Sequence, residues 1–334
     1  IQAGEPIGAY VVNQASDGRS YWVFALVIPI NDGDLSVRLK PSSATLDQVK
    51  ALYSNLREAE DEPDYTIEAG VSALTEAITQ MGFDTYKQFM TQALLTEMAS
   101  RAEHLIGVNR ATLDALAAIQ GAVEKVVTRA GEFRRLFEKT TQIPFNMRLQ
   151  AVRMEGRDGP IGVIANNHQI MTGKLREEVT ELQNSASKGT EPLAETQFLT
   201  CAMLLIEELT QTFAQEASTD QDRQKIDNAL LLETYNRLHR RMSRAIAETT
   251  KLSQLLSSLC HSFKRTMSSL ETTRVMCKIE QSRFDGDASG LQAIADALLV
   301  TESRFSEGIV GIEEEVARID KAVQQFCGVS RKAA

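Results

Sequence analysis

Hydrophobic positions in the first part of the chain come in short runs separated by turn sequences. The turn residues include Asp17 and Gly18, and such a pair between apolar runs is typical of an antiparallel hairpin. Ser42 and Ser43 then precede a helical pattern that ends near Asp61, because short hydroxyl side chains favour helix N-caps. We therefore expect a three-stranded meander followed by a helix. The predicted strands cover 8–13, 21–30 and 34–40.

From about Tyr65 onward, apolar residues recur at alternating spacings of three and four, which indicates helices that pack as coiled coils. Segments rich in glycine, proline and small polar residues interrupt this pattern and mark the helix ends. The clearest heptad stretches run from Leu116 to Phe137, from Tyr235 to Phe263 and from Phe305 to Phe326. The interruptions are 155–160, 184–192, 218–220 and 284–290.

The expected fold is mostly α, with a small N-terminal antiparallel β-meander followed by a long antiparallel helical coiled-coil hairpin or bundle. Residues 1–61 form the first predicted domain and 62–334 the second, with a bend at 155–162 where glycines let the backbone reverse. Pro144 predicts a break near Gln142, because proline inside a helix removes a backbone hydrogen bond.

Two segments lack an obvious partner in this scheme. The last predicted helix, 291–327, exceeds what one hairpin needs, so it should fold back or pair with another chain. The apolar face of the meander has no cover within the first domain, so we expect upstream sequence or a partner to complete it. We also expect a homo-oligomer held by heptad faces. Its predicted seam is Phe305, Ile309, Ile312, Val316, Ile319 and Val323.

Composition narrows the choice of function. The 334 residues carry a net charge of −9 without a long basic run, which argues against nucleic acid as a partner. No apolar run is long enough to span a membrane. The four cysteines are far apart and lack metal-ligand spacing, which is typical of a reducing compartment, so we expect a cytoplasmic protein without a metal site.

Two segments of the meander resemble a known family. Ser20-Tyr-Trp-Val-Phe-Ala25 and Ser36-Val-Arg-Leu-Lys-Pro-Ser42 are similar to the last strands of the PAS domain of aerotaxis-type receptors. The resemblance covers about half of a PAS domain and implies a sensory module. In those receptors this strand lines a flavin pocket, so Trp22 is the candidate cofactor-binding residue; alternatively, it belongs to the core or a dimer face. We expect no cofactor in the visible half, which has no His or Cys within 1–103 to bind haem iron, and flavin or haem only if the other half is present.

The bend carries a second resemblance. The segment from Asn146 to Ala165, Asn-Met-Arg-Leu-Gln-Ala-Val-Arg-Met-Glu-Gly-Arg-Asp-Gly-Pro-Ile-Gly-Val-Ile-Ala, is similar to the hairpin tip of methyl-accepting chemoreceptors. The resemblance implies a histidine kinase and a coupling adaptor as partners. Phe145 and Leu149 should face Ile164 and His168 across the hairpin. The candidate partner-binding residues are Phe145, Asn146, Arg153, Glu155 and Arg157.

Two functions remain open from the sequence. The first is a cytoplasmic chemoreceptor-like signal transducer, in which a PAS module reports to a helical hairpin that contacts partner proteins. The second is a structural scaffold that assembles through its coiled coils into an array or filament. Pro144 and the absence of paired Glu/Gln sites with small neighbours, the family's methylation pattern, favour the scaffold. Without a nucleophile motif or a phosphate-binding glycine motif, we expect no enzymatic activity.

Overall fold

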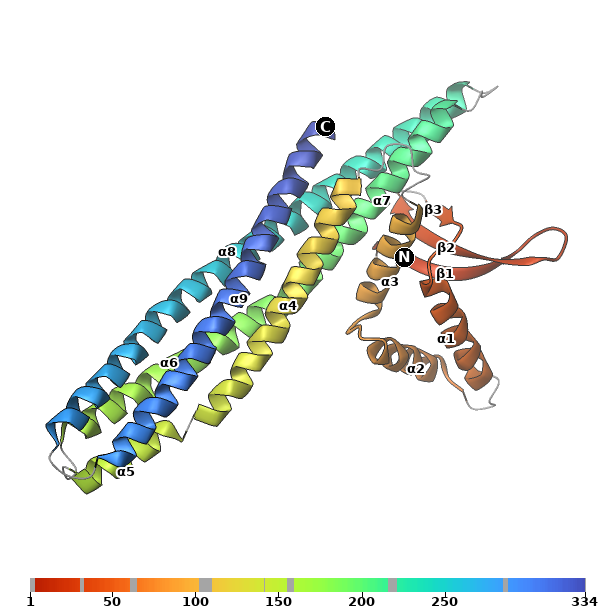
Figure 1. The fold of residues 1–334 in the computed structure, drawn as a ribbon. Helices are drawn as coiled ribbons and strands as arrows, with labels where there is room; N and C mark the ends of the chain where they lie inside the picture. Colours follow the sequence, from red (N-terminus) through yellow and green to blue (C-terminus); the bar gives the residue numbers. More distant parts are fainter. Residues whose placement is uncertain are drawn as a thin grey trace. The chain divides into compact units, whose positions relative to one another are not determined.

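Helices make up most of the structure, with a small antiparallel sheet at the N-terminus (Figure 1), as the sequence predicts. The strands are β1 (Ile7–Gln14), β2 (Ser20–Ile30) and β3 (Gly33–Leu39). The helices are α1 (Thr45–Glu60), α2 (Ile67–Gln80), α3 (Tyr86–Arg101), α4 (Arg110–Thr140), α5 (Ile143–Met154), α6 (Pro160–Lys188), α7 (Thr190–Gln215), α8 (Gln221–Arg283) and α9 (Ser289–Ala333). This computed structural model describes residues 4–30, 33–60, 65–101, 110–140, 142–154, 159–215, 221–284 and 288–333.

The chain forms two compact units, each built from two separate segments. Unit 1 comprises residues 1–114 and 191–247, and therefore holds the sheet, α1 to α3, α7 and the first part of α8. Unit 2 comprises residues 115–190 and 248–334, with most of α4, all of α5 and α6, the rest of α8, and α9. Unit 1 thus extends well beyond the domain of 1–61 expected from the sequence.

The sheet has the predicted meander order β1-β2-β3 with antiparallel pairing. Gly18 in the β1–β2 turn has a φ of 86°, a backbone conformation that glycine adopts without steric cost. Val12 pairs with Trp22, and Phe24 pairs with Tyr10 on one side and Leu39 on the other, so these residues lie on one face of the sheet.

Helices of unit 1 cover this face, which corrects the expectation that upstream sequence or a partner does so. Phe24 is fully buried, and a Cβ added at Gly8 would lie 2.7 Å from its ring and 3.5 Å from the ring of Phe198 in α7. Helix α3 also packs on β1. The cover comes from segments far along the chain, so it was not visible within the first domain.

Glu97 of α3 joins this helix to the sheet. Its buried carboxylate accepts hydrogen bonds from Tyr10 Oη at 2.8 Å, from the backbone N–H groups of Ser42 and Ser43 at 2.7 and 3.1 Å, and from Ser43 Oγ at 2.6 Å. Burial, followed by the bond to Glu97, raises the pKa of Tyr10. The carboxylate thereby fixes the chain where it leaves β3 and enters α1.

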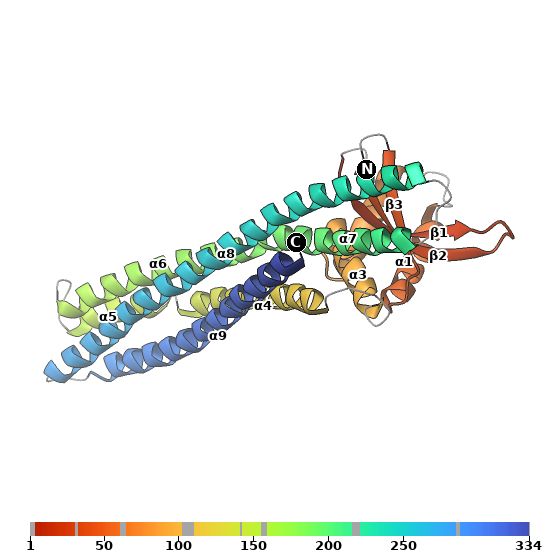
Figure 2. The ribbon, with the colours of Figure 1, turned by 90° about the horizontal axis from the view of Figure 1, so that it is seen from above.

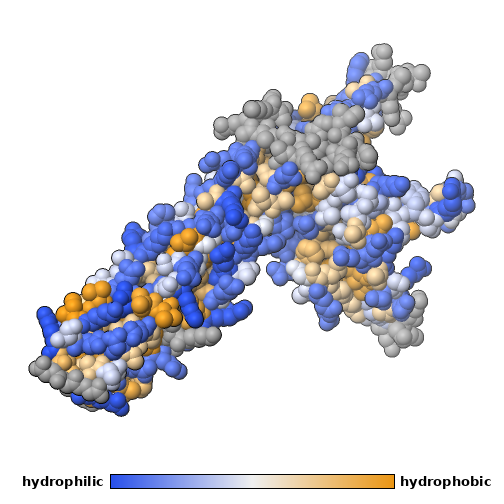
Figure 3. Space-filling model, in the orientation of Figure 1, coloured by the Kyte–Doolittle hydropathy of each residue, from blue (hydrophilic) through white to orange (hydrophobic). Residues whose placement is uncertain are grey.

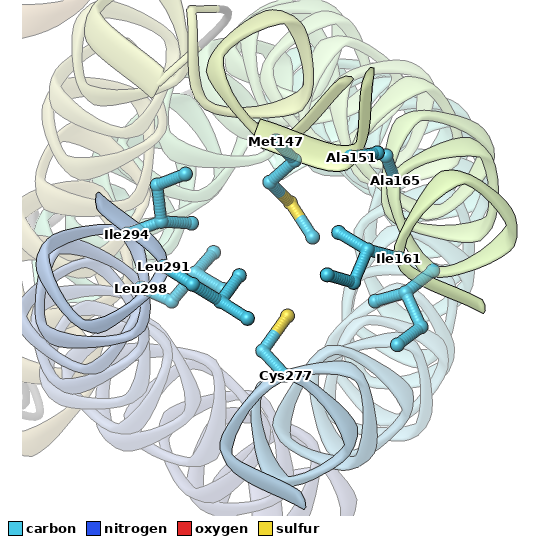
Figure 4. Packing of buried hydrophobic residues seen from close by; sticks show 9 residues of the cluster. Met147, Ala151, Ile161, Ala165, Cys277, Leu291, Ile294 and Leu298 are labelled. Carbon is cyan, nitrogen blue, oxygen red and sulfur yellow. The ribbon is translucent and has the colours of Figure 1, made fainter. Parts of the chain in front are cut away.

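Unit 2 is a bundle in which α4 with α5, α6, α8 and α9 lie side by side (Figures 1 and 2). At the end of the bundle that contains α5, residues of α5, α6, α8 and α9 form one apolar cluster (Figure 4). A second layer is aromatic: Phe305 of α9 stacks on Phe137 at 4.3 Å between ring centroids, and Phe133 and Phe263 complete the group. The apolar cluster at the α5 end consists of Met147, Ala151, Ile161, Ile164, Ala165, Cys277, Leu291, Ile294 and Leu298.

The helix ends of unit 2 follow the sequence signals. Helix α4 ends at Thr140 and α5 begins at Ile143, so the break predicted from Pro144 is confirmed. Helices α5 and α6 pack on each other on either side of the predicted bend, with Pro160 at the start of α6, where its missing N–H costs little. Helix α9 folds back along the bundle, one of the two outcomes expected. In the described ranges, no helix is both long and apolar enough to cross a membrane.

The two halves of the bundle repeat each other at a constant spacing of 130 positions, as Phe133 and Phe263 show. Residues 161–180 and 291–310 have the same order of buried, half-buried and exposed positions, residue by residue. Helices α8 and α9 therefore reproduce the hairpin of α4, α5 and α6. Further buried pairs at this spacing are Val126 and Leu256, Met147 and Cys277, Leu175 and Phe305, Val179 and Ile309, and Leu182 and Ile312.

Candidate functional site

The predicted tip residues lie on an exposed face of α5. Phe145 is 63% exposed, and Leu149 and Val152 continue the same stripe at helical spacing. Asn146 and Arg153 are also exposed, whereas Glu155 and Arg157 lie outside the described residues. Three large apolar side chains thus face outward on a helix of only twelve residues, Ile143–Met154.

Helix α6 carries further exposed apolar side chains. Val163 and Ile170 are 59% and 63% exposed, and Arg148 of α5 donates hydrogen bonds to Asn166 and Gln169 of α6. A shallow hollow of about 460 Å³ lies beside Arg148 and reaches Lys174 and Glu177. Figure 3 shows that hydrophobic patches alternate with hydrophilic ones over the end of unit 2 that carries α5, without distinguishing one helix face from another. We give the name face 1 to five residues of α5 and α6: Phe145, Arg148, Leu149, Ile170 and Lys174.

The expected contact of Phe145 and Leu149 with Ile164 and His168 is wrong. Ile164 and His168 are buried, and Ile164 packs in the cluster that contains Met147 and Ala151. The register across the hairpin therefore places Met147, not Phe145, against α6, and leaves Phe145 free for contact with another molecule.

The repeat places a matching surface on α8 and α9. Val275, Ile279 and Val300 occupy the positions of Phe145, Leu149 and Ile170, and they are 48%, 46% and 54% exposed. Met276 and Leu299 add two further exposed apolar side chains. The charged positions recur as well. Lys278, Arg304 and Glu307 correspond to Arg148, Lys174 and Glu177, and all are exposed. We name the surface of Val275, Lys278, Ile279, Val300 and Arg304 face 2.

Sequence reasoning missed face 2, although weak signals for it exist. Phe-Arg-Arg at 133–135 recurs as Phe-Lys-Arg at 263–265, and Arg-Met-Glu-Gly at 153–156 recurs as Arg-Phe-Asp-Gly at 283–286. Few other residues are identical between the two halves, because buried positions accept any apolar residue of suitable size.

The predicted seam between chains is a core inside one chain. Phe305, Ile309, Ile312 and Val316 are at most 3% exposed, and Ile319 and Val323 are 0% and 5% exposed. The ring of Phe305 contacts the rings of Phe133, Phe137 and Phe263 in the same unit. The prediction of an oligomer seam at these six residues is therefore corrected: the heptad face is real, but other helices of this chain cover it.

Trp22 lies in the wall of a hollow within unit 1. Its ring is tilted against Tyr53 of α1, with 5.8 Å between ring centroids. The hollow has a volume of about 900 Å³ and lies between Val12 and Trp22 of the sheet, α1 and α2. The structure therefore places this candidate residue beside a space large enough for a small molecule.

A histidine, His168, and a cysteine, Cys277, are buried in the core of unit 2. Among the described residues no group of His, Cys, Asp and Glu could hold a metal ion. Burial lowers the pKa of His168 to about 4 and raises the pKa of the Cys277 thiol to about 11, so both are neutral at neutral pH. His104 lies outside the described residues.

No family model matches this chain, and no curated protein or solved structure resembles it significantly.

Proposed function

We propose that this protein is a cytoplasmic, non-enzymatic signal-transduction protein of the chemoreceptor type, in which a PAS-like unit is coupled to a helical bundle that docks partner proteins at face 1. The observation that carries the proposal is the exposure of Phe145, Leu149 and Ile170. Leu149 lies within the segment, Asn146 to Ala165, that resembles a chemoreceptor tip, and Phe145 directly precedes it. Contiguous exposed apolar side chains on a helical surface are typical of protein-binding sites.

Charge indicates the kind of surface that docks there. Arg148 and Lys174 flank the apolar stripe of face 1 on a chain whose net charge is −9. A partner with an apolar ridge bordered by carboxylates would complement this surface, and a histidine kinase or coupling adaptor of that chemistry is the partner that we propose. The three described cysteines are free and buried, which supports a reducing compartment.

A photo-cross-linking experiment in the native cell tests the proposal. A benzophenone amino acid at position 145 of the intact chain should capture a kinase or adaptor, identified by mass spectrometry. The same group at Leu255, 43% exposed on α8 but not on either face, is the matched control and should capture neither. Phe145→Glu should reduce recovery of the partner at least tenfold in a pulldown while leaving the melting temperature unchanged, because this side chain is largely exposed.

The scaffold function is the second candidate, and the presence of two matching faces favours it. A molecule with two equivalent docking surfaces can link two neighbours, and repeated links of this kind build arrays. Capture of this chain alone at position 145, together with a large assembly in sedimentation, would replace the signalling proposal by the scaffold.

A further inference from the structure

The hollow beside Trp22 has the size and walls of a small-molecule site. Its volume of about 900 Å³ falls within the range of roughly 300–1,000 Å³ that such sites occupy. Three aromatic side chains, Trp22, Tyr53 and Tyr65, line it together with aliphatic residues from β1, α1 and α2. All of these residues belong to unit 1.

The floor of the hollow is held in place by the sheet. Tyr53 Oη donates a hydrogen bond to the backbone carbonyl of Tyr10 at 3.3 Å, and its ring packs against Trp22. Burial raises the pKa of Tyr53, so its hydroxyl remains a donor at neutral pH. The ring of Tyr53 is thereby fixed as a wall.

Helix α2 turns an unfilled apolar stripe toward this floor. Ile67, Val71 and Leu74 line the hollow at the spacing of one helix face, as does Gly70. Ile67 is 85% and Val71 60% exposed, whereas an apolar stripe that faces another helix is normally buried against it. The space between α1 and α2 is therefore apolar, preformed and unoccupied by side chains of the described residues.

Helix α1 supplies charge along one edge. Lys50, Ser54 and Arg57 line the hollow from successive turns, with Glu60 beyond them. Asp47 lies 3.3 Å from Lys50 and holds part of its charge, whereas Arg57 has no ion pair among the described residues. Two cations, Lys50 and Arg57, and one anion, Glu60, line this edge, and because Lys50 is paired with Asp47, Arg57 is the cation best placed to bind an anion.

We propose that this hollow binds an amphipathic monocarboxylate such as a fatty acid. The carboxylate lies against Arg57 and Lys50, where it forms charge-assisted hydrogen bonds, and the apolar body lies between Val71 and the ring of Trp22. Arginine suits this role because its guanidinium can bind a carboxylate with two parallel hydrogen bonds. This site is separate from faces 1 and 2, and its test does not depend on the proposed docking function.

The single tryptophan of the chain makes the test direct, because the indole emission reports on this hollow alone. Dodecanoate, titrated below its micellar concentration into the intact protein, should change the emission of Trp22 with saturation. Dodecanol, which has the same apolar body without the charge, should bind about tenfold more weakly, since it forms neutral rather than charge-assisted bonds.

Two variants and one control locate the site. Arg57→Gln should remove the preference for dodecanoate over dodecanol. Val71→Asp should weaken binding of both ligands, because it places a charged group in the apolar wall that contacts their shared alkyl chain. Both positions are exposed, so these variants should fold normally. Arg38→Gln removes an exposed cation elsewhere in unit 1 and should change nothing.

Three results would overturn the proposal. Equal affinity for dodecanoate and dodecanol would show that the hollow has no anion subsite. If the emission of Trp22 shows no saturable change, the hollow does not bind either ligand. Saturable binding of flavin mononucleotide, with dodecanoate inactive, would assign the hollow to a flavin instead.

Discussion

Glu97 shows how much of unit 1 depends on one buried carboxylate. It is fully buried, and its two oxygens accept the bonds from Tyr10, Ser42 and Ser43 described above. The residues next to Glu97 in the sequence do not indicate this role, because its hydrogen-bond partners lie more than fifty positions away along the chain. A lone glutamate in a helix is ordinarily read as a solvent-exposed residue.

Glu97→Gln should destabilise unit 1 by about 2–3 kcal/mol. The amide keeps the shape of the side chain but replaces one acceptor oxygen by an N–H₂ group, which faces donors and leaves buried polar groups unpaired. Thermal unfolding followed by circular dichroism measures this loss. Glu58→Gln on the exposed side of α1 is the matched control. A loss as small as in this control would show that the Glu97 bonds do not hold the sheet to α3.

His168 makes the stability of unit 2 depend on pH. Burial lowers its pKa to about 4, whereas an unfolded chain has a histidine pKa of about 6.5. The unfolded state therefore binds the proton first as the pH falls, and stability decreases between about pH 6.5 and pH 4. The expected loss at pH 5 is about 2 kcal/mol.

His168→Leu should remove this part of the pH dependence. The repeat already contains the substitution, because Leu298 is buried at the equivalent position of α9. Thr172 keeps its bond to the His168 backbone carbonyl at 2.8 Å, so the change should cost little at pH 7. Denaturant melts at pH 7 and pH 5 measure both values. Equal pH sensitivity of variant and parent would exclude His168 as the cause.

At the scale of helices, the sequence predicted most of what is local. The strands, the Asp17-Gly18 turn and the first helix lie where the patterns placed them, because each depends on residues close together. Pro144 predicted the end of α4 for the same reason. The packing register of α5 on α6 was missed, since heptad spacing near a bend does not decide which apolar residues turn inward.

Helices α8 and α9 are joined by a partly buried ion pair. Arg274 Nε lies 2.6 Å from Glu302 Oε2, and their side chains are 18% and 7% exposed. Burial raises the pKa of Glu302, although Arg274 opposes this shift. The two residues occupy the positions of Pro144 and Thr172 in the other half of the repeat.

Arg274→Met should cost about 3 kcal/mol, more than Glu302→Gln, because it leaves a buried carboxylate without its cation. The double variant should recover part of this loss. Urea unfolding of the two single variants and the double variant measures the coupling between them. Additive losses would mean that the two charges do not stabilise each other.

For the molecule as a whole, sequence periodicity identified the buried faces but not what buries them. A heptad face can pack on another chain or on a distant helix of its own chain, and the same pattern of apolar residues is found in both cases. The structure decides this for α9, whose apolar face packs inside unit 2. Faces 1 and 2 could not be derived from periodicity, because they consist of the apolar residues that fall outside it.

Ile312→Glu should therefore unfold unit 2 rather than dissociate an oligomer. Ile312 is 1% exposed, and a carboxylate there should cost more than about 4 kcal/mol. Val310→Glu on the same helix is the matched control, because Val310 is 44% exposed. Circular dichroism and light scattering separate the outcomes. A folded Ile312→Glu variant of lower mass would restore the seam between chains.

Because both halves of the repeat in unit 2 belong to one chain, the two halves can differ in sequence. In a bundle formed by two identical copies of one hairpin, every substitution would occur twice, and one proline codon would interrupt a helix in both copies. Here Pro144 interrupts one side, while the equivalent Arg274 lies within the continuous helix α8. Each side can thus change without its counterpart. Under the proposed docking function, faces 1 and 2 could therefore come to bind different partners.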